Sequence, residues 1–573
     1  MALTDRHFAL ASSGGPDGVP TATALHSGLL HGKCGGAQLS KGARVTDPAS
    51  ASDREDTTRS RPLPSRVGWL IAFLVPLLSL VIFRPWVPES HPVWDWGDLV
   101  PLFQGADGVL STVAALAERY GAEGRANLLG YLQLAITWEL FGESAVGWQV
   151  GRAVLMVVMA TIFVAACRRA GASPAAAGLG GLVLLLGTAT AEGFLFIMGE
   201  PLGVCFLIGI FILTLEYPGS DSWRRDAVWI GILALALLLT KEFMGIALPP
   251  LVMIALCGGP SGYLRLPRWD ARTRWLVGVL TVVLVLEVIL LLTTLQSGGA
   301  QGYAAAYGTG DGSSATFFAL VRAMTLPTWF ASSSPGTVLY PSNFLAVLLF
   351  LAGGVAALRH CWPRVPALVL LGLLPLVGAA AYSLWPRYSA FYGIPFWTGA
   401  AALMVASATL MGRRSRIGWV VAPLTLAVMA LYAGIVADRT IREKHAFASV
   451  AEQVVRALPS WPGVDSLLMA VPAEGGRRWP VTGPELERYA HAVGVVATAV
   501  PPGRDVTCAE VADRLRTGLT RVALINDRGP CGQLPVRTGM HTRVYQYLDW
   551  IDFRWRRDSV AVESLVPSLF GGR

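Results

Sequence analysis

The chain has 573 residues, of which 53% are hydrophobic and only 15% are charged. Soluble globular proteins average about 25% charged residues, so this composition excludes an ordinary soluble domain and indicates a membrane protein. The formal net charge of +8 does not indicate nucleic-acid binding, because the arginines are spread over short segments between apolar runs instead of forming one basic surface.

Residues 1–66 differ in composition from the rest of the chain. They are rich in Gly, Ser, Thr, Asp and Arg and contain no long apolar stretch, which predicts a disordered tail. Their most apolar part, "HSGLLHGKCGG", is too short and too polar to be the apolar core of a signal peptide.

From Val67 onward the chain contains apolar runs of the length that crosses a bilayer as a helix, about 17–25 residues. We therefore predict an all-α polytopic membrane domain over residues 67–437 with about eleven membrane-spanning helices. The fourth, fifth and sixth runs are short, so a merged or re-entrant segment is an alternative there. The runs cover residues 67–83, 148–167, 174–191, 201–216, 227–240, 244–257, 275–295, 342–358, 365–383, 391–411 and 417–437.

Basic residues concentrate in every second connection between these runs. Because cytoplasmic loops carry an excess of Lys and Arg, this pattern predicts a cytoplasmic N-terminus, and the odd number of spans then predicts an extracytoplasmic C-terminal segment. The basic connections contain Arg168 with Arg169, Arg224 with Arg225, "RLPRWDARTR", Arg359 with Arg364, and "RRSR".

Residues 438–573 lose the membrane-like composition. Short apolar segments such as "VDSLLMAV", "GVVATAV" and "RVALIND" are typical of buried strands, and "HAFASVAEQVVRAL" has helical spacing. We predict a small extracytoplasmic α/β domain. Of seven cysteines, only Cys508 and Cys531 fall in it, on the side of the membrane that is expected to be oxidising. They are predicted to form a disulfide, with two free thiols as the alternative.

The first predicted outer connection, near residues 84–147, is unusually long and polar. It begins with "HPVWDWGD", which contains Asp95 and Asp98, and continues with "DGVLSTVAALAERYG" and "NLLGYLQLAITWELFG". The last two segments have amphipathic helical spacing and predict helices lying in the membrane interface. Glu200, Lys241 and Arg387 are predicted at the same face of the membrane. Charges at this depth are costly and usually serve a function.

These motifs occur in a recognisable order. "WDWGD" is followed by "EGRANLLGYLQL", "FGESAVGWQVGRAV", "GEP", "LLLTKEFMGIALPPL" and "PRYSAFYGIPFW". Over roughly residues 67–411 the chain resembles the polytopic C-type fold glycosyltransferases that use lipid-linked sugars, such as the protein O-mannosyltransferases and the lipid A aminoarabinose transferases. The His-Pro that follows the Tyr in many O-mannosyltransferase-like members is absent, since "NLLGYLQL" stands in its place, which leaves the acceptor class open.

The resemblance implies an enzyme that transfers a sugar from a polyprenyl phosphate to a lipid, glycan or protein acceptor at the outer face of the cytoplasmic membrane. It places Asp95 as the general base that takes the acceptor's proton, with Asp98 as the second choice. The alternative is that the two acids only stabilise the N-terminus of the following helix. Trp96 would anchor the segment in the interface and stack on sugar.

The leaving phosphate needs positive charge. The resemblance places Arg387 there, next to Tyr388, because a guanidinium can bind phosphate through paired hydrogen bonds; the alternative is contact with lipid headgroups. The other residues proposed to contact the substrate also have structural explanations. Lys241 could instead pair with Glu242, Glu200 could simply favour its helix N-terminus, and Arg125 with Tyr131 could be structural.

No cofactor is expected, although Asp95, Asp98 and Glu200 could together hold a divalent metal ion through oxygen ligands. Two other functional classes stay open. A transporter or lipid flippase could use the outer charges as a substrate path, and an assembly protein could bind through its C-terminal domain. The spans show no clear internal repeat and few interior charges, which favours chemistry at the membrane surface over transport.

Overall fold

The computed structural model describes a large part of the chain. The described residues are 74, 77–84, 93–121, 125–194, 199–257, 269–294, 313–328, 341–359, 365–383, 393–414, 416–457, 466–470, 497–499, 520–524, 537–548 and 554–566.

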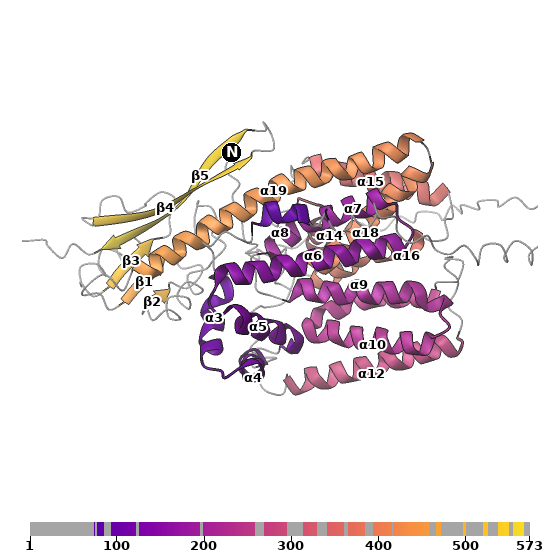
Figure 1. The fold of residues 1–573 in the computed structure, drawn as a ribbon, viewed down its shortest axis with the longest axis horizontal. Helices are drawn as coiled ribbons and strands as arrows, with labels where there is room; N and C mark the ends of the chain where they lie inside the picture. The colour runs from indigo at the N-terminus through magenta and orange to yellow at the C-terminus, as the bar shows by residue number, and fades with distance from the viewer. Residues whose placement is uncertain are drawn as a thin grey trace, which may run out of the picture.

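The helices form a bundle in which the longer members run roughly along the long axis of the molecule (Figure 1). The N-terminal half contains α3 (Val93–Gln104), α4 (Val109–Gly121), α5 (Leu128–Phe141), α6 (Ala145–Arg169), α7 (Pro174–Leu186), α8 (Thr188–Gly193), α9 (Glu200–Glu216), the 3-10 helix η1 (Tyr217–Gly219), α10 (Trp223–Thr240), the 3-10 helix η2 (Glu242–Ala247), α11 (Leu248–Cys257) and α12 (Ala271–Thr294). It is followed by α14 (Ser314–Thr325), α15 (Pro341–Arg359), α16 (Val365–Leu371), α17 (Leu374–Ser383), α18 (Ile394–Arg414) and α19 (Arg416–Ala457).

The prediction of a polytopic helical membrane protein is confirmed. Within the described residues, five helical stretches are long and apolar enough to cross a membrane, in α6, α9, α12, α18 and α19, and five further apolar helices are shorter. The outer face of α12 has the character of a lipid-facing surface, because Val282, Leu284, Ile289 and Leu292 are all more than half exposed.

Two of the predicted spans are broken in the structure. The run at 174–191 divides into α7 and α8, and the run at 365–383 divides into α16 and α17. The first break falls at Gly187, where the backbone leaves the helix with φ −61° and ψ 149°. A Cβ at Gly187 would lie 2.4 Å from Nε1 of Trp397, so the close approach of the tryptophan requires glycine here.

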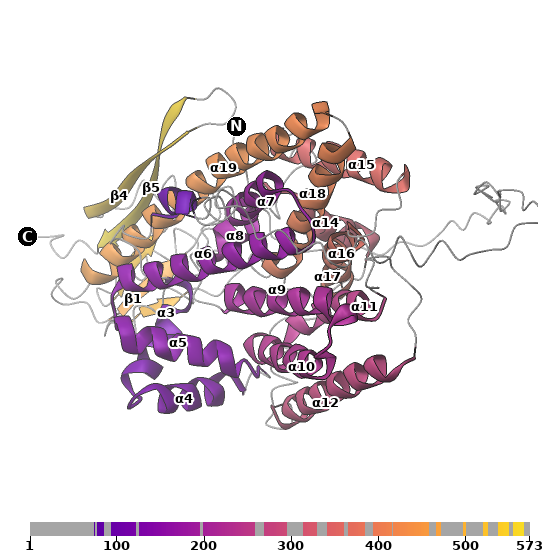
Figure 2. The same cartoon turned by 45° about the vertical axis from the view of Figure 1, so that its right-hand side comes forward.

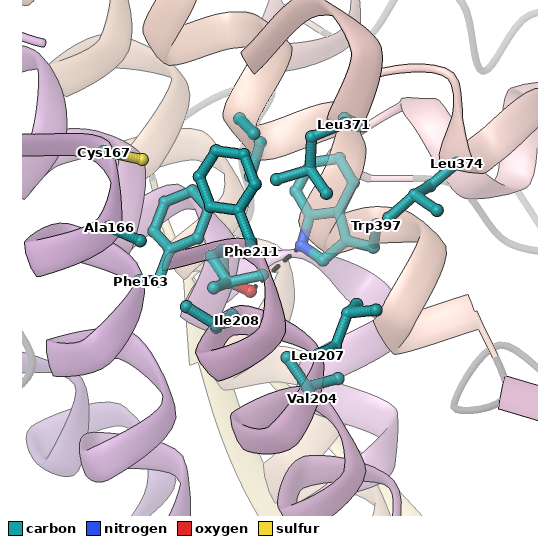
Figure 3. Close-up of a cluster of buried hydrophobic side chains, with 14 of the residues drawn as sticks. Phe163, Ala166, Cys167, Val204, Leu207, Ile208, Phe211, Leu371, Leu374 and Trp397 are labelled. Carbon is teal, nitrogen blue, oxygen red and sulfur yellow. Dashed lines mark hydrogen bonds between the residues drawn. The ribbon is translucent and has the colours of Figure 1, made fainter. Parts of the chain in front are cut away.

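Trp397 marks the centre of the apolar core. Its side chain is 1% exposed, and its indole N–H donates to the carbonyl of Leu184 at 3.0 Å. Figure 3 shows this hydrogen bond beside aliphatic and aromatic side chains that come from α6, α9, α16 and α17. The bond satisfies both the indole and a carbonyl near the end of α7, which would otherwise lack a partner in an apolar interior.

Local sequence signals explain where several helices begin. Ser144, Ser173 and Ser313 are the N-caps of α6, α7 and α14, and each side-chain oxygen accepts from a backbone N–H in the first turn at 3.1 to 3.2 Å. Pro174 follows Ser173 at the first helical position. A backbone N–H there would have no partner within the helix, so proline loses no hydrogen bond.

The bundle has two chemically distinct ends. Helices α3, α4 and α5 gather at one end, which we call the α5 end (Figures 1 and 2). The opposite end contains the connections after α6, α9 and η1. There Arg169 pairs with Glu216 at 3.6 Å, and the Tyr217 hydroxyl donates to the carbonyl of Arg272 at 2.8 Å. Two helices, α4 and α5, thus stand where interfacial helices were predicted, packed on each other at one end of the bundle.

The last helix differs from its prediction. A span at 417–437 and a separate helix near 445–458 were expected, but α19 is one helix of 42 residues. The segment between the two predictions contains no Gly or Pro, so nothing local ends the helix where the composition becomes polar. In both views α19 runs from the bundle to the strands, which lie at the α5 end (Figures 1 and 2).

The C-terminal strands form one sheet in the order β2-β1-β3-β5-β4. The predicted strands β1 (Ser466–Ala470), β2 (Ala497–Ala499) and β3 (Thr520–Leu524) pair in parallel. The longest strands, β4 (Arg537–Leu548) and β5 (Trp555–Val566), were not predicted; they pair antiparallel along their full length. Their mixture of charged and apolar residues lacks the continuous apolar runs that indicated the other strands.

A charged cluster joins the first helical segment to α19 and β5. Arg84 lies 3.6 Å from Asp438, and Arg442 donates to the same carboxylate at 2.8 Å. The Arg442 guanidinium also lies 5.5 Å from the ring centre of Trp555 on β5. Next to this cluster, just past the apolar part of α19, His445 is 8% exposed. Burial, and secondarily the charge of Arg84, lowers the pKa of His445 to about 4.

His445 should therefore make folding sensitive to acid. The folded state holds it neutral, whereas the unfolded state takes up a proton below its ordinary pKa of about 6.5. Its contribution is fully present above that value and is lost as the pH falls toward 4. Between about pH 7.5 and pH 5 we expect a loss of about 2 kcal/mol in the free energy of unfolding, measured by denaturant titration of the purified protein. His445→Gln should remove this part of the pH dependence, and an identical pH profile for both proteins would contradict the assignment.

Candidate active site

The segment that enters α5 is held by aromatic contacts. The Arg125 guanidinium lies 5.6 Å from the ring centre of Tyr120 at the end of α4. Tyr120 in turn stacks on Tyr131 of α5, with ring centres 5.8 Å apart, and the Tyr131 hydroxyl donates a long hydrogen bond of 3.5 Å to the carbonyl of Arg125. Arg119 lies 5.7 Å from the same Tyr120 ring. Two guanidinium groups are thus positioned where α4 meets α5.

A buried ion pair lies between two other helix ends. Lys241 Nζ is 3.2 Å from Glu200 Oε1, and their side chains are only 6% and 2% exposed. Glu200 is the first residue of α9, where the helix dipole favours a carboxylate. Lys241 follows the last residue of α10 in an extended conformation, and its ammonium is 5.9 Å from the ring centre of Phe243. The carboxylate and the ammonium therefore compensate each other's charge.

Two glycines bring α5 against this pair. A Cβ at Gly130 of α5 would lie 3.1 Å from the carbonyl oxygen of Thr240, the residue before Lys241. A Cβ at Gly199, the residue before Glu200, would lie 3.4 Å from the Cα of Gly130. The Cβ at Gly130 would be tight against a backbone oxygen, whereas the Cβ at Gly199 would touch Gly130 at an ordinary van der Waals distance, so glycine at 130 favours this approach. The start of α5, the start of α9 and the end of α10 therefore meet at one place.

An amide oxygen of α5 lies at this place, and a second lies at the N-cap of the same helix. Gln133 Oε1 is 3.4 Å from the position a Cβ would take on Gly199, and Asn127, the N-cap of α5, is 5% exposed. Within the described residues, Asn127 Oδ1 and Gln133 Oε1 are buried and accept no hydrogen bond. Buried amides normally have partners, so these two oxygens are candidate acceptors for a polar ligand or water.

A buried arginine of α6 supports the entry to α9. Arg152 is 8% exposed and donates from Nη1 to the carbonyl of Phe194, shortly before Gly199. Phe194 also stacks on Phe83 of the helical segment at residues 77–83, with ring centres 4.7 Å apart. Arg152 occurs in the motif "FGESAVGWQVGRAV" but had no predicted role. A charged residue inside an apolar helix is the signal that could have indicated one.

The predicted acids lie on α3. Asp95 and Asp98 are the third and sixth residues of this helix, which also contains Trp96. Residues three apart share a helix face, but the side chains of these residues lie outside the described atoms. The helix itself is anchored by Phe103, which stacks on Trp138 of α5 at 4.8 Å and lies 6.0 Å from Trp148 of α6. The acid-bearing helix and α5 are thus parts of one packed unit.

The remaining predicted residues are placed as follows. Lys241 pairs with Glu200, and the side chain of Glu242, its alternative partner, lies outside the described atoms. Arg387, Tyr388, Cys508 and Cys531 also lie outside the described residues. Among the described residues, no group of three His, Cys, Asp or Glu side chains could hold a metal ion. The side chains of Asp95 and Asp98 lie outside the described atoms, so the predicted alternative of a metal site stays a prediction.

Comparison with known proteins finds no matching family model and no matching curated protein. Three solved structures are similar in arrangement. The first is ArnT from Cupriavidus metallidurans bound to undecaprenyl phosphate, with a TM-score of 0.48 and 14% identity, covering 89% of this chain and 100% of that one. The second is the arabinofuranosyltransferase AftD from Mycobacteria, with a TM-score of 0.43 and 14% identity, covering 87% of this chain and 40% of that one. The third is the oligosaccharyltransferase of Archaeoglobus fulgidus, with a TM-score of 0.41 and 11% identity, covering 79% of this chain and 67% of that one.

All three are polytopic C-type glycosyltransferases. They represent the same class that the order of sequence motifs resembles. Every TM-score lies below 0.5 and every identity below 15%, so these likenesses are too distant to transfer an activity or a residue role to this chain.

Proposed function

We propose that the protein is an integral membrane glycosyltransferase that moves a sugar from a polyprenyl phosphate to an acceptor at the α5 end of the bundle. One observation carries the proposal: the acid-bearing helix α3, the arginine-bearing start of α5 and the buried Glu200–Lys241 pair all lie at this end. An acid, cations and buried polar groups are the parts that a transfer from a phosphate leaving group requires.

The proposed reaction is a displacement at the anomeric carbon of the donor sugar. An acceptor hydroxyl or amine forms the new bond to the anomeric carbon, and the bond between that carbon and the phosphate oxygen breaks. The acceptor's proton passes to the carboxylate of Asp95, with Asp98 as the second candidate. The electron pair of the broken bond stays on the phosphate, so polyprenyl phosphate leaves with an additional negative charge.

We assign the neutralisation of that charge to arginine. Arg125 stands at the start of α5 with its guanidinium supported by Tyr120, and Arg387 is the second proposed phosphate contact. Lys241 is less suited to this role because Glu200 already compensates its charge at 3.2 Å. The Glu200–Lys241 pair is proposed instead to position the groups around the sugar.

The proposed orientation follows the basic connections. The end with Arg168, Arg169 and Arg225 would face the cytoplasm, so the α5 end and the C-terminal sheet would lie outside. The protein would then act at the outer face of the cytoplasmic membrane.

The proposal is tested by the release of undecaprenyl phosphate, the lipid bound in the ArnT structure, from purified protein in nanodiscs. Undecaprenyl phosphates carrying a hexose, a pentose or an amino sugar are the donors, and extracted envelope glycans, lipids and proteins are the acceptors. We expect release that depends on both protein and acceptor. With the protein in vesicles, movement of the donor across the membrane without release of undecaprenyl phosphate would contradict the proposal and favour a flippase. Absence of undecaprenyl phosphate release from every donor would also count against the proposal.

A further inference from the structure

The buried amides at the start of α5 have no role in the proposed chemistry. Asn127 and Gln133 are not acids, bases or cations, and the Asn127 side chain makes no capping hydrogen bond at the start of α5. Their oxygens are nevertheless buried without a hydrogen bond within the described residues. Leaving such an oxygen unpaired is costly, so the site is built for a ligand that donates hydrogen bonds.

The surroundings limit the charge of that ligand. Glu200 and Lys241 form a contact of 3.2 Å and sum to zero charge, and the two amides are neutral. An ionic group bound against these four side chains would find no uncompensated opposite charge among them, and burying a charge without a partner is unfavourable. A neutral group rich in hydroxyls can donate to both amide oxygens at no such cost.

We propose that Asn127 and Gln133 form the subsite that recognises the donor's sugar, and that this sugar is neutral. The inference rests on the proposed function. Sugar hydroxyls would donate to Asn127 Oδ1 at the N-cap of α5 and to Gln133 Oε1, which lies beside Gly199 at the start of α9. The phosphate would lie toward Arg125, which precedes Asn127 by two residues. The site thereby separates recognition of the sugar from recognition of the phosphate.

The test compares the binding of two lipids in nanodiscs: undecaprenyl phosphate without sugar, and undecaprenyl phosphate carrying a neutral hexose or pentose. In Asn127→Leu and Gln133→Met, we expect the dissociation constant of the sugar-linked lipid to rise by about 3- to 10-fold per lost hydrogen bond. The dissociation constant of the sugar-free lipid should not change.

Gln104→Met is the matched control, because it makes the same chemical change at an exposed residue whose amide bonds to Glu143 at 2.9 Å. It should leave both dissociation constants unchanged. Equal weakening of both lipids in the Asn127 and Gln133 variants would indicate a general packing role and overturn the inference. Unchanged binding of both lipids would show that water alone satisfies the amides, and would overturn it as well.

These outcomes are separate from a failure of the proposed function. If the native protein releases undecaprenyl phosphate but the amide variants bind sugar like the native protein, only the sugar subsite is wrong. The transferase proposal itself fails if the native protein binds sugar-linked and sugar-free lipid equally and releases no undecaprenyl phosphate from the sugar-linked donor. A donor with an amino sugar that binds as tightly as its neutral counterpart would contradict the predicted neutral preference.

Discussion

Asp95→Asn is expected to lower the rate of sugar transfer by about 10²–10⁴-fold, the usual contribution of a general base. The amide has nearly the shape of the carboxylate but cannot accept the acceptor's proton. Because the substitution leaves Arg125 and the helix contacts of Phe103 in place, the affinity for undecaprenyl phosphate should stay within about twofold of the native value on this reasoning. The measurement is acceptor-dependent release of undecaprenyl phosphate alongside its binding.

Asp98→Asn is the matched comparison for this variant, since it makes the same change one helical turn away. If Asp95 is the base, Asp98→Asn should retain most of the activity. Full activity in Asp95→Asn together with a large loss in Asp98→Asn would transfer the role to Asp98. Full activity in both variants would show that the acids only stabilise the start of α3.

The second large effect is expected at the Glu200–Lys241 pair. Lys241→Met leaves a carboxylate buried at 2% exposure without its cation, and Glu200→Gln leaves an uncompensated ammonium. Removing one partner of a buried ion pair typically costs about 3–5 kcal/mol of stability. We expect losses of this size in each single variant, measured by guanidinium denaturation in detergent micelles.

The double variant distinguishes an ion pair from two independent residues. Glu200→Gln with Lys241→Met removes both charges, so its loss should be smaller than the sum of the two single losses. Arg169→Met is the control, because its pair with Glu216 is 52% and 37% exposed; exposed pairs contribute only about 0–1 kcal/mol. Strictly additive losses in the double variant would show that the two charges do not depend on each other.

Several features of this protein could be predicted from the sequence because they depend on local pattern. Apolar runs of membrane length predicted the bundle, and amphipathic spacing predicted α4 and α5. Short apolar segments predicted β1, β2 and β3, although the mixed polarity of β4 and β5 concealed the longest strands of the sheet. The helical propensity between the last span and the C-terminal domain was continuous, yet the change in composition suggested two helices where α19 is one.

The candidate site could be predicted only in part from the sequence. The motifs identified Arg125, Tyr131, Glu200 and Lys241 as polar residues at expected membrane depth. Lys241 had an acidic neighbour in Glu242, so local reasoning could not select its partner. The pairing with Glu200 depends on which helix ends meet, and no pattern within either segment contains that information.

Composition and periodicity by themselves determined that this chain is a helical membrane protein, because burial of apolar surface acts on every residue independently of its distant neighbours. Only the tertiary structure decided that the start of α5 packs against the start of α9 and the end of α10, where Gly130 and Gly199 lie at the contact. That contact places Gln133 Oε1 next to Gly199, the residue before Glu200 of the buried ion pair. Hydrogen bonds and ion pairs act over a few ångströms, so their partners are set by packing between segments far apart in the sequence.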